Sequence, residues 1–157
     1  GKRYGLIGAN GAGKTTFLKM LSGVEDITEG EVQIQSEKKV GVLNQNQFEF
    51  DNFSLFDTVL QGNKRLFNAI KEKEKLYTEE YTDKIGERLG ELEMICVEED
   101  PTYEYDVKIT KILESLGFPA SMHQELMGTL TGGDKFKVLL AQVLYPKPDI
   151  LFLDEPT

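Results

Sequence analysis

Eight residues near the start of the chain are of the types that bind a phosphate. Residues 8–15 read Gly-Ala-Asn-Gly-Ala-Gly-Lys-Thr and match the P-loop pattern G-x-x-x-x-G-K-[ST] at every position. Because glycine has no Cβ, Gly8, Gly11 and Gly13 predict a backbone that turns with positive φ and presents its N–H groups to phosphate oxygens. The pattern predicts that Lys14 reaches the β- and γ-phosphates and that the Thr15 hydroxyl binds Mg²⁺. The predicted nucleotide-binding residues are Gly8, Ala9, Asn10, Gly11, Ala12, Gly13, Lys14, Thr15 and Thr16.

The residues on either side predict the elements that position this loop. Residues 4–7 (Tyr-Gly-Leu-Ile) are typical of a buried strand that runs into the loop, and residues 16–21 predict a helix that leaves it. This helix would direct its N-terminus, the positive end of its dipole, at the anion. Because strand, glycines, lysine, hydroxyl and helix occur in this order, the pattern favours a phosphate site over a chance glycine loop.

A second candidate group follows an apolar run at residues 150–153. Four consecutive large apolar side chains suit a central strand of a parallel sheet that is buried on both faces. In P-loop enzymes such a strand carries the Asp that holds Mg²⁺, here Asp154, and Glu155 is placed to orient and deprotonate the attacking water. By themselves these two acids indicate a strand cap. Together with the P-loop they predict phosphoryl transfer to water.

Two glycines precede a helical pattern between these two groups. Apolar side chains at positions 136, 139, 140, 143 and 144 follow helical spacing, so Gly132 and Gly133 lie just ahead of a predicted helix start. The N-terminus of a helix favours an anion. For these residues alone, a helix cap by Thr131 or Asp134 is the better interpretation.

In their order and spacing, the three motifs resemble those of the ATP-binding cassette superfamily. The stretch Leu130, Thr131, Gly132, Gly133 and Asp134 resembles the cassette signature, usually Leu-Ser-Gly-Gly-Gln. The hydroxyl and both glycines are kept, whereas Asp134 departs from the usual Gln. Gln45 falls where the family has its Q-loop glutamine, which touches Mg²⁺ and the attacking water. Its place at the end of a strand-like run favours it over Gln47.

This resemblance implies an α/β fold with a P-loop NTPase core, a mostly parallel sheet and an inserted helical subdomain, truncated at both ends. Residues 1–50 would hold the P-loop and Q-loop, residues 51–128 a helical subdomain with an arm-like hairpin, and residues 129–157 the signature helix and the Walker B strand. The implied ligands are ATP and Mg²⁺. The implied metal ligands are Thr15, Gln45 and Asp154, and the implied catalytic residues are Glu155, Gln45 and Lys14.

The family arrangement also implies a partner. Each ATP in the family lies between the P-loop of one cassette and the signature of another, in the same chain or a second copy. Residues 130–134 would therefore serve a nucleotide bound elsewhere, and this chain alone is expected to bind MgATP weakly and to hydrolyse it more slowly than about 1 s⁻¹.

Flanking segments narrow the resemblance to one branch. Residues 17–23, 57–62 and 139–144 resemble those of the ABC-F group, soluble twin-cassette ATPases that act on ribosomes. That branch implies a cytoplasmic protein with ribosome or tRNA as partner. Two alternatives stay open: the nucleotide-binding subunit of a transporter, with a membrane subunit as partner, and a nucleotide-gated binding module whose closure matters more than its turnover.

Composition limits the other classes of function. The 157 residues allow one domain with a real core, and no stretch approaches 18 apolar residues. The only cysteine, Cys96, is predicted to be a core residue, and the only histidine, His123, to lie on the surface. A net charge of −9 opposes electrostatic attraction to nucleic acid. The one local basic cluster favours i,i+4 ion pairs on a helix over an RNA patch; it comprises Lys64, Arg65, Lys71, Lys73 and Lys75.

Helical patterns fill the region before the signature. Apolar residues from Leu66 to Leu92 form one stripe, which Thr78-Glu79-Glu80 or the glycines at 86 and 90 would interrupt. Residues 98–101 break the pattern, and a second helix over residues 107–116 would complete a hairpin. Ser54 or Asp57 is expected to cap the first helix of this region.

Overall fold

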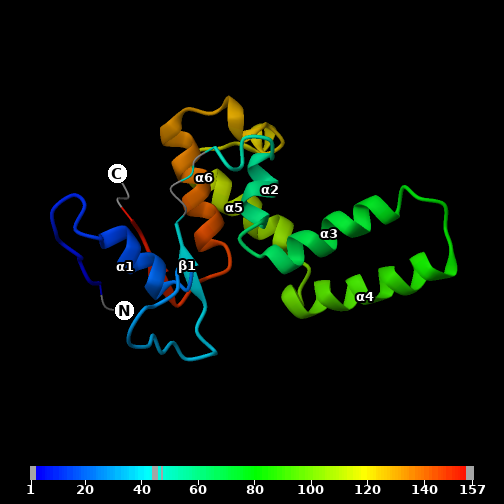
Figure 1. Ribbon diagram of the computed structural model, residues 1–157. Helices are drawn as coiled ribbons and strands as arrows, with labels where there is room; N and C mark the ends of the chain where they lie inside the picture. Colours follow the sequence, from blue (N-terminus) through cyan, green and yellow to red (C-terminus); the bar gives the residue numbers. More distant parts are fainter. Residues whose placement is uncertain (1–2, 44–45, 47, 155–157) are drawn as a thin grey trace. The chain divides into compact units, whose positions relative to one another are not determined.

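The computed structural model describes residues 3–43, residue 46 and residues 48–154 (Figure 1). The chain divides into two compact units, one of residues 1–45 with 147–157 and one of residues 46–146. The first unit contains the P-loop and the apolar run before Asp154, and the second contains the signature. The expected three-part division at residues 50 and 128 stays a prediction.

The described residues of the first unit form one helix and one pair of strands. Helix α1 (Lys14–Leu21) follows the P-loop as predicted. Strands β1 (Val40–Val42) and β2 (Ile150–Phe152) pair in parallel, with Gly41 opposite Leu151. The Asp149 carboxylate accepts hydrogen bonds from the Lys39 N–H at 3.0 Å and the Lys38 amine at 3.1 Å, which lower its pKa. This carboxylate thus connects the start of β2 to the start of β1.

Two predictions about strands in this unit are wrong. Residues 4–7 have no strand structure, and Tyr4 and Ile7 are 86% and 96% exposed. A strand depends on a hydrogen-bonding neighbour, and in the part of the chain that is described the only paired strands are β1 and β2. Strand β2 does pair with β1, but it is not buried on both faces: Leu151 remains exposed, and Ile150 and Phe152 are half-buried.

The second unit has its core among three helices. These are α2 (Leu55–Leu60), α5 (Tyr105–Ser115) and α6 (Gly132–Leu144). Ser54 is the N-cap of α2, since its hydroxyl accepts the Asp57 N–H at 3.0 Å, which confirms the first of the two expected caps. The largest side chains that are fully buried in this core are Leu55, Val59, Leu60, Ile109, Leu113, Met127, Val138 and Leu139.

A helical hairpin extends the same unit. Helices α3 (Lys64–Leu76) and α4 (Asp83–Glu99) lie side by side (Figure 1) and bury Leu66, Ala69 and Leu92. The hairpin turn lies at residues 77–82, which confirms the expected interruption at Thr78-Glu79-Glu80, whereas the prediction of a hairpin that turns at residues 98–101 is wrong. The Thr78 hydroxyl bonds the Lys75 carbonyl at 2.7 Å, and Thr82 caps α4, so local hydrogen bonds end one helix and start the next. The glycines at 86 and 90 lie within α4 and do not interrupt it.

The basic cluster on α3 stabilises this hairpin. Arg65 bonds Glu98 and Glu99 at 2.6 and 2.8 Å, and Lys73 pairs with Glu93. On the opposite helix, Arg88 of α4 forms two bonds with Glu72 of α3, at 2.7 and 2.9 Å. The cluster forms ion pairs, but the expected i,i+4 spacing is wrong for those described: Arg65 and Lys73 pair with α4, and Lys71 pairs with Asp57 and, at i,i+3, with Glu74. The hydrogen bond and charge of Glu93 raise the pKa of Lys73, so this amine stays charged.

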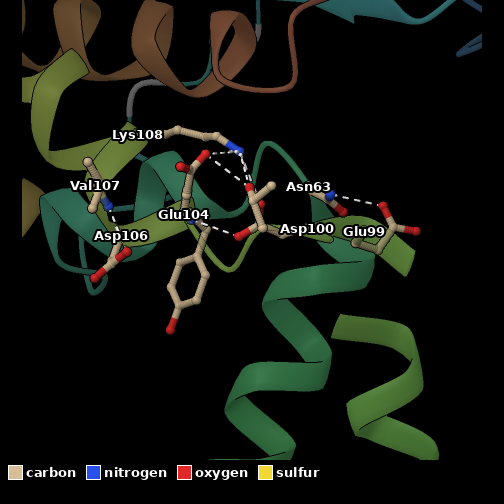
Figure 2. Close-up of polar contacts among 9 residues, drawn as sticks. Asn63, Glu99, Asp100, Glu104, Asp106, Val107 and Lys108 are labelled. Carbon is tan, nitrogen blue, oxygen red and sulfur yellow. Dashed lines mark hydrogen bonds and ion pairs between the residues drawn. The ribbon is translucent and has the colours of Figure 1, made fainter. Parts of the chain in front are cut away.

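The junction between the hairpin and α5 is polar and ordered (Figure 2). The buried Asp100 carboxylate accepts the Tyr105 N–H at 2.7 Å and the Lys108 amine at 3.1 Å. Asn63 at the start of α3 donates to Glu99 at 2.9 Å. These contacts connect α3, the end of α4 and the first turn of α5.

His123 corrects another prediction. It follows the short helix η1 (Ala120–Met122) and is only 4% exposed, so it is not a surface residue. Its Nε2 lies 2.9 Å from the Phe118 carbonyl oxygen. Burial is tolerated because the imidazole keeps this polar partner. A second short helix, η2 (Met127–Thr129), leads towards α6.

Candidate phosphate site and signature turn

The P-loop adopts the backbone that its glycines predict at two of three positions. Gly11 and Gly13 have φ of 81° and 87°, in the left-handed region that favours glycine. Gly8 does not have a positive φ, so that part of the prediction is wrong. A turn between the Ala12 N–H and the Ala9 carbonyl, at 3.1 Å, shapes the loop instead. Gly13 is the N-cap of α1, so the loop runs directly into the first turn of the helix.

The N-terminus of α1 has hydrogen-bond donors for an anion. The first N–H groups of a helix lack partners within the helix, and no side chain caps this one. Thr15 and Thr16 lie exposed in the first turn. Together with the dipole of the helix, these donors favour negative charge at the loop.

Lys14 lies across the loop. Its Nζ donates to the Gly8 carbonyl at 2.7 Å and to the Ala9 carbonyl at 2.9 Å. These neutral carbonyls are weaker partners for an ammonium group than phosphate oxygens are. The loop thus holds a positive charge beside the uncapped helix start, and this combination suits a polyphosphate.

The expected metal ligands are described only in part. Thr15 and Asp154 both belong to the first unit, and Asp154 follows β2, whereas Gln45, its alternative Gln47, and Glu155 lie outside the described residues. A hydroxyl and a carboxylate are the oxygen donors that Mg²⁺ prefers. No group of three or more His, Cys, Asp or Glu that could hold a metal ion occurs within residues 3–43, 46 and 48–154. The donors fit Mg²⁺ in the way usual at nucleotide sites, where one or two protein oxygens combine with substrate phosphates.

The signature turn starts α6 in the second unit. Thr131 is the N-cap: its hydroxyl accepts the Asp134 N–H at 3.3 Å and donates to the Asp134 carboxylate at 3.0 Å. Lys137 bonds the other carboxylate oxygen at 2.8 Å. The Lys137 and Thr131 hydrogen bonds lower the pKa of Asp134, so a negative charge lies at this helix start. Of the two expected caps, the structure confirms Thr131, and Asp134 bonds back to it.

A cavity of about 220 Å³ lies elsewhere, at the base of the hairpin, and Lys73, Cys96, Asp100 and Tyr105 are among its lining residues. None of these belongs to a predicted site. Cys96 is buried, and burial raises its thiol pKa. This confirms the prediction that Cys96 is a core residue, since a reactive cysteine needs a lowered pKa.

Lys135 was not among the predicted site residues. This lysine follows the signature directly, yet it is buried and its amine bonds Asp51. The helical spacing 135, 138, 139, 142 places it on the buried face of α6, and this was the available signal.

Comparisons with known proteins agree with the motifs. The family model described as ABC transporter matches residues 1–157. YkpA of Bacillus subtilis strain 168 is 42% identical over 158 residues, and YbiT of Escherichia coli O157:H7 is 40% identical over 158 residues; both are named as ATP-binding proteins. The energy-dependent translational throttle protein EttA of Escherichia coli K12 is 30% identical over 162 residues. Each match covers all of this chain but only 29–30% of the relative.

Solved structures support the same fold. An inward-facing ABC transporter described as of metal-chelate type matches with a TM-score of 0.60 and 22% identity, over 97% of this chain and 49% of that chain. The RNase-L Inhibitor matches with a TM-score of 0.50 and 24% identity, over 94% of this chain and 21% of that chain. At these identities the likeness shows the cassette fold alone. None of the helices in the described part of the chain is long and apolar enough to cross a membrane.

Proposed function

The chain belongs to the ABC transporter ATP-binding domain family, and from this membership we propose that it is the ATP-hydrolysing cassette of an ABC-F type protein that acts on the ribosome. The observation that carries the nucleotide part is the uncapped start of α1 with Lys14 beside it. Because the chain spans about three tenths of the curated relatives it matches, the activity and partners of the whole protein are part of this proposal.

The proposed roles follow the chemistry of each residue. The amides of residues 8–16 and Lys14 bind the phosphates. Thr15, Gln45 and Asp154 hold Mg²⁺, which supplies neutralisation of phosphate charge when bound. Glu155 accepts the proton of the attacking water, and Gln45 orients that water. Residues 130–134 face a nucleotide held by a second cassette.

The translation role rests on relatives rather than on charge. EttA is named a translational throttle and is 30% identical to this chain. The hairpin segment of residues 63–100 has seven basic and eleven acidic side chains, and the described salt bridges engage Arg65, Lys71, Lys73 and Arg88. We therefore expect this hairpin to dock by shape and by contacts with protein rather than by electrostatic attraction to RNA.

Co-sedimentation with ribosomes tests this function. In the full-length gene product, Glu155→Gln keeps the shape of the side chain but removes the proton acceptor, so ATP should bind and remain uncleaved. We expect this variant to pellet with ribosomes through a sucrose gradient in ATP and to stay near the top without it. The double variant Lys14→Ala/Glu155→Gln is the control and should not pellet in either condition. Pelleting with membranes instead would contradict the ribosomal role. It would favour the alternative, the nucleotide-binding subunit of a transporter, which binds a membrane subunit.

Asp134 is expected to weaken the composite ATP site. Its ionised carboxylate lies in the first turn of α6, where it would repel a phosphate presented to Thr131 and Gly132. Asp134→Gln in the full-length product should therefore tighten binding of a fluorescent ATP analogue by about fivefold, or ~1 kcal/mol. Glu114→Gln, an equal charge change on an exposed residue of α5, should leave the affinity unchanged. Equal ATP affinity in the unmodified protein, Asp134→Gln and Glu114→Gln would contradict the binding of an ATP phosphate at the signature turn.

A further inference from the structure

Lys135 is a buried cation with two specific partners. It lies in the first turn of α6 and is 6% exposed. Its Nζ lies 2.6 Å from Asp51 Oδ1 and 4.9 Å from the centre of the Phe48 ring. A buried ammonium group is unfavourable unless it is paired, so the bond to Asp51 is the contact that allows Lys135 to stay buried. The neighbouring pair Lys137–Asp134 is more exposed at both ends and constrains the turn less.

The backbone joins the same two segments. The Gly128 N–H donates to the Asp51 carbonyl at 3.0 Å, and the Met127 N–H donates to the Phe53 carbonyl at 2.9 Å. Further along, the Leu55 N–H donates to the Glu125 carbonyl at 3.0 Å. Residues 51–55 therefore run antiparallel to residues 125–128 and are hydrogen-bonded to them, and residues 125–128 lead into the signature turn. Lys135 adds a side-chain contact from the far end of that turn back to Asp51.

The placement of these contacts suggests a role. In sequence, Asp51 lies six residues after Gln45, and Lys135 follows Asp134 directly. The signature turn is thus held at both ends, by Gly128 before it and Lys135 after it, and both are bonded to the same residue, Asp51. A displacement of Asp51 would therefore move the signature turn through two bonds, one to Gly128 and one to Lys135.

We propose that Lys135 is a positioning residue that uses Asp51 and Phe48 to orient the signature turn of residues 130–134 for its phosphate. This role rests on the proposed function of that turn. Lys135 does not contact the nucleotide. It sets the direction of the Thr131 hydroxyl and of the first N–H groups of α6 relative to the segment that follows Gln45. Because orientation matters most in the transition state, its loss should lower kcat more than it raises KM.

The test compares Lys135→Met, Asp51→Asn and the double variant in the full-length gene product. We expect kcat for ATP hydrolysis to fall about tenfold in each single variant, with KM changed less than twofold. The double variant should be no worse than Lys135→Met, because the two changes break one contact. Hydrogen exchange should speed up at residues 128–135 and leave the helices of the hairpin unchanged.

Lys108→Met is the matched control. It also breaks a bond between a lysine and an Asp of the second unit, here the buried Asp100 at the base of the hairpin (Figure 2). It should lower stability without changing kcat or the exchange of residues 128–135. Asp51→Asn is the variant to use should Lys135→Met fail to fold, because Asp51 is partly exposed and the substitution removes its charge with little change in size.

Each outcome decides one of two claims. If folded Lys135→Met and Asp51→Asn match Lys108→Met in kcat and in exchange at residues 128–135, the positioning role is overturned. Additive losses in the double variant would also overturn it, since they require independent contacts. If the unmodified protein fails to bind or hydrolyse ATP, the proposed function fails, and the exchange measurement by itself still decides whether Lys135 orders the turn.

Discussion

Replacing Lys14 by alanine is expected to weaken ATP binding by about 100-fold, because a hydrogen bond to a charged group contributes up to ~3 kcal/mol. Lys14 is the side-chain cation at the P-loop, and in the described part of the chain its amine bonds the nearby Gly8 and Ala9 carbonyls. When phosphate binds, the amine can exchange these neutral acceptors for charged ones. Because both existing partners lie within the loop, the substitution should leave the secondary structure unchanged.

A fluorescent ATP analogue titrated into the full-length gene product measures this effect, with circular dichroism to verify folding. Lys19→Ala is the matched control on the same helix: Lys19 is exposed and pairs with Glu25 at 3.2 Å, away from the loop. It should change the affinity by less than about twofold, as expected for a surface ion pair. Normal affinity in Lys14→Ala would show that the phosphate assignment is wrong.

The second large effect is expected at Gly62, where two helices of the second unit approach closely. A Cβ at this position would lie 2.1 Å from the Gln142 carbonyl oxygen of α6 and 3.1 Å from the Val59 carbonyl oxygen of α2. Both are backbone atoms, so a methyl group cannot be accommodated by a change of rotamer. Gly62→Ala should therefore separate α2 from α6 and lower the free energy of unfolding by about 3 kcal/mol. Native-state hydrogen exchange of the α2 and α6 amides measures this loss.

Gly90→Ala makes the same chemical change with the opposite expected sign. Gly90 lies within α4, its φ is not positive, and a Cβ added there would have no neighbouring atom within 4 Å. Alanine at this position should stabilise the hairpin by up to ~1 kcal/mol, because it has the higher helix propensity. If Gly62→Ala and Gly90→Ala lowered the free energy of unfolding equally, the close approach at Gly62 would not be the cause of the loss of stability.

Local elements were predictable where local sequence decides them. The helix after the P-loop, the cap at Ser54 and the cap at Thr131 all follow from residues within one turn of the position concerned. The buried state of Cys96 followed from its apolar neighbours. Membership of the ATP-binding cassette family was also predictable, because three motifs in a fixed order are far more specific than any one of them.

Other features depended on contacts between distant residues. Residues 4–7 have a strand-like composition but no partner strand among the described residues, so the strand that their composition predicts does not form. The apolar stripe from Leu66 to Leu92 is divided into α3 and α4 at the first of its two expected interruptions, where local hydrogen bonds at Thr78 and Thr82 end one helix and start the next. Tyr77 and Tyr81 belong to that predicted stripe and are 68% and 71% exposed.

The sequence by itself indicated the chemistry proposed for this protein: a candidate phosphate-binding loop, candidate metal and water ligands, and a signature, each defined by residue types at short spacing. Tertiary structure alone decided which charges act together. In the sequence, Lys135 is an ordinary polar residue of a predicted helix. Its bond to Asp51, 84 positions away, forms because α6 packs against the segment that contains Asp51. The pairing of two distant charges is a property of segments brought together by folding, so no local pattern specifies it.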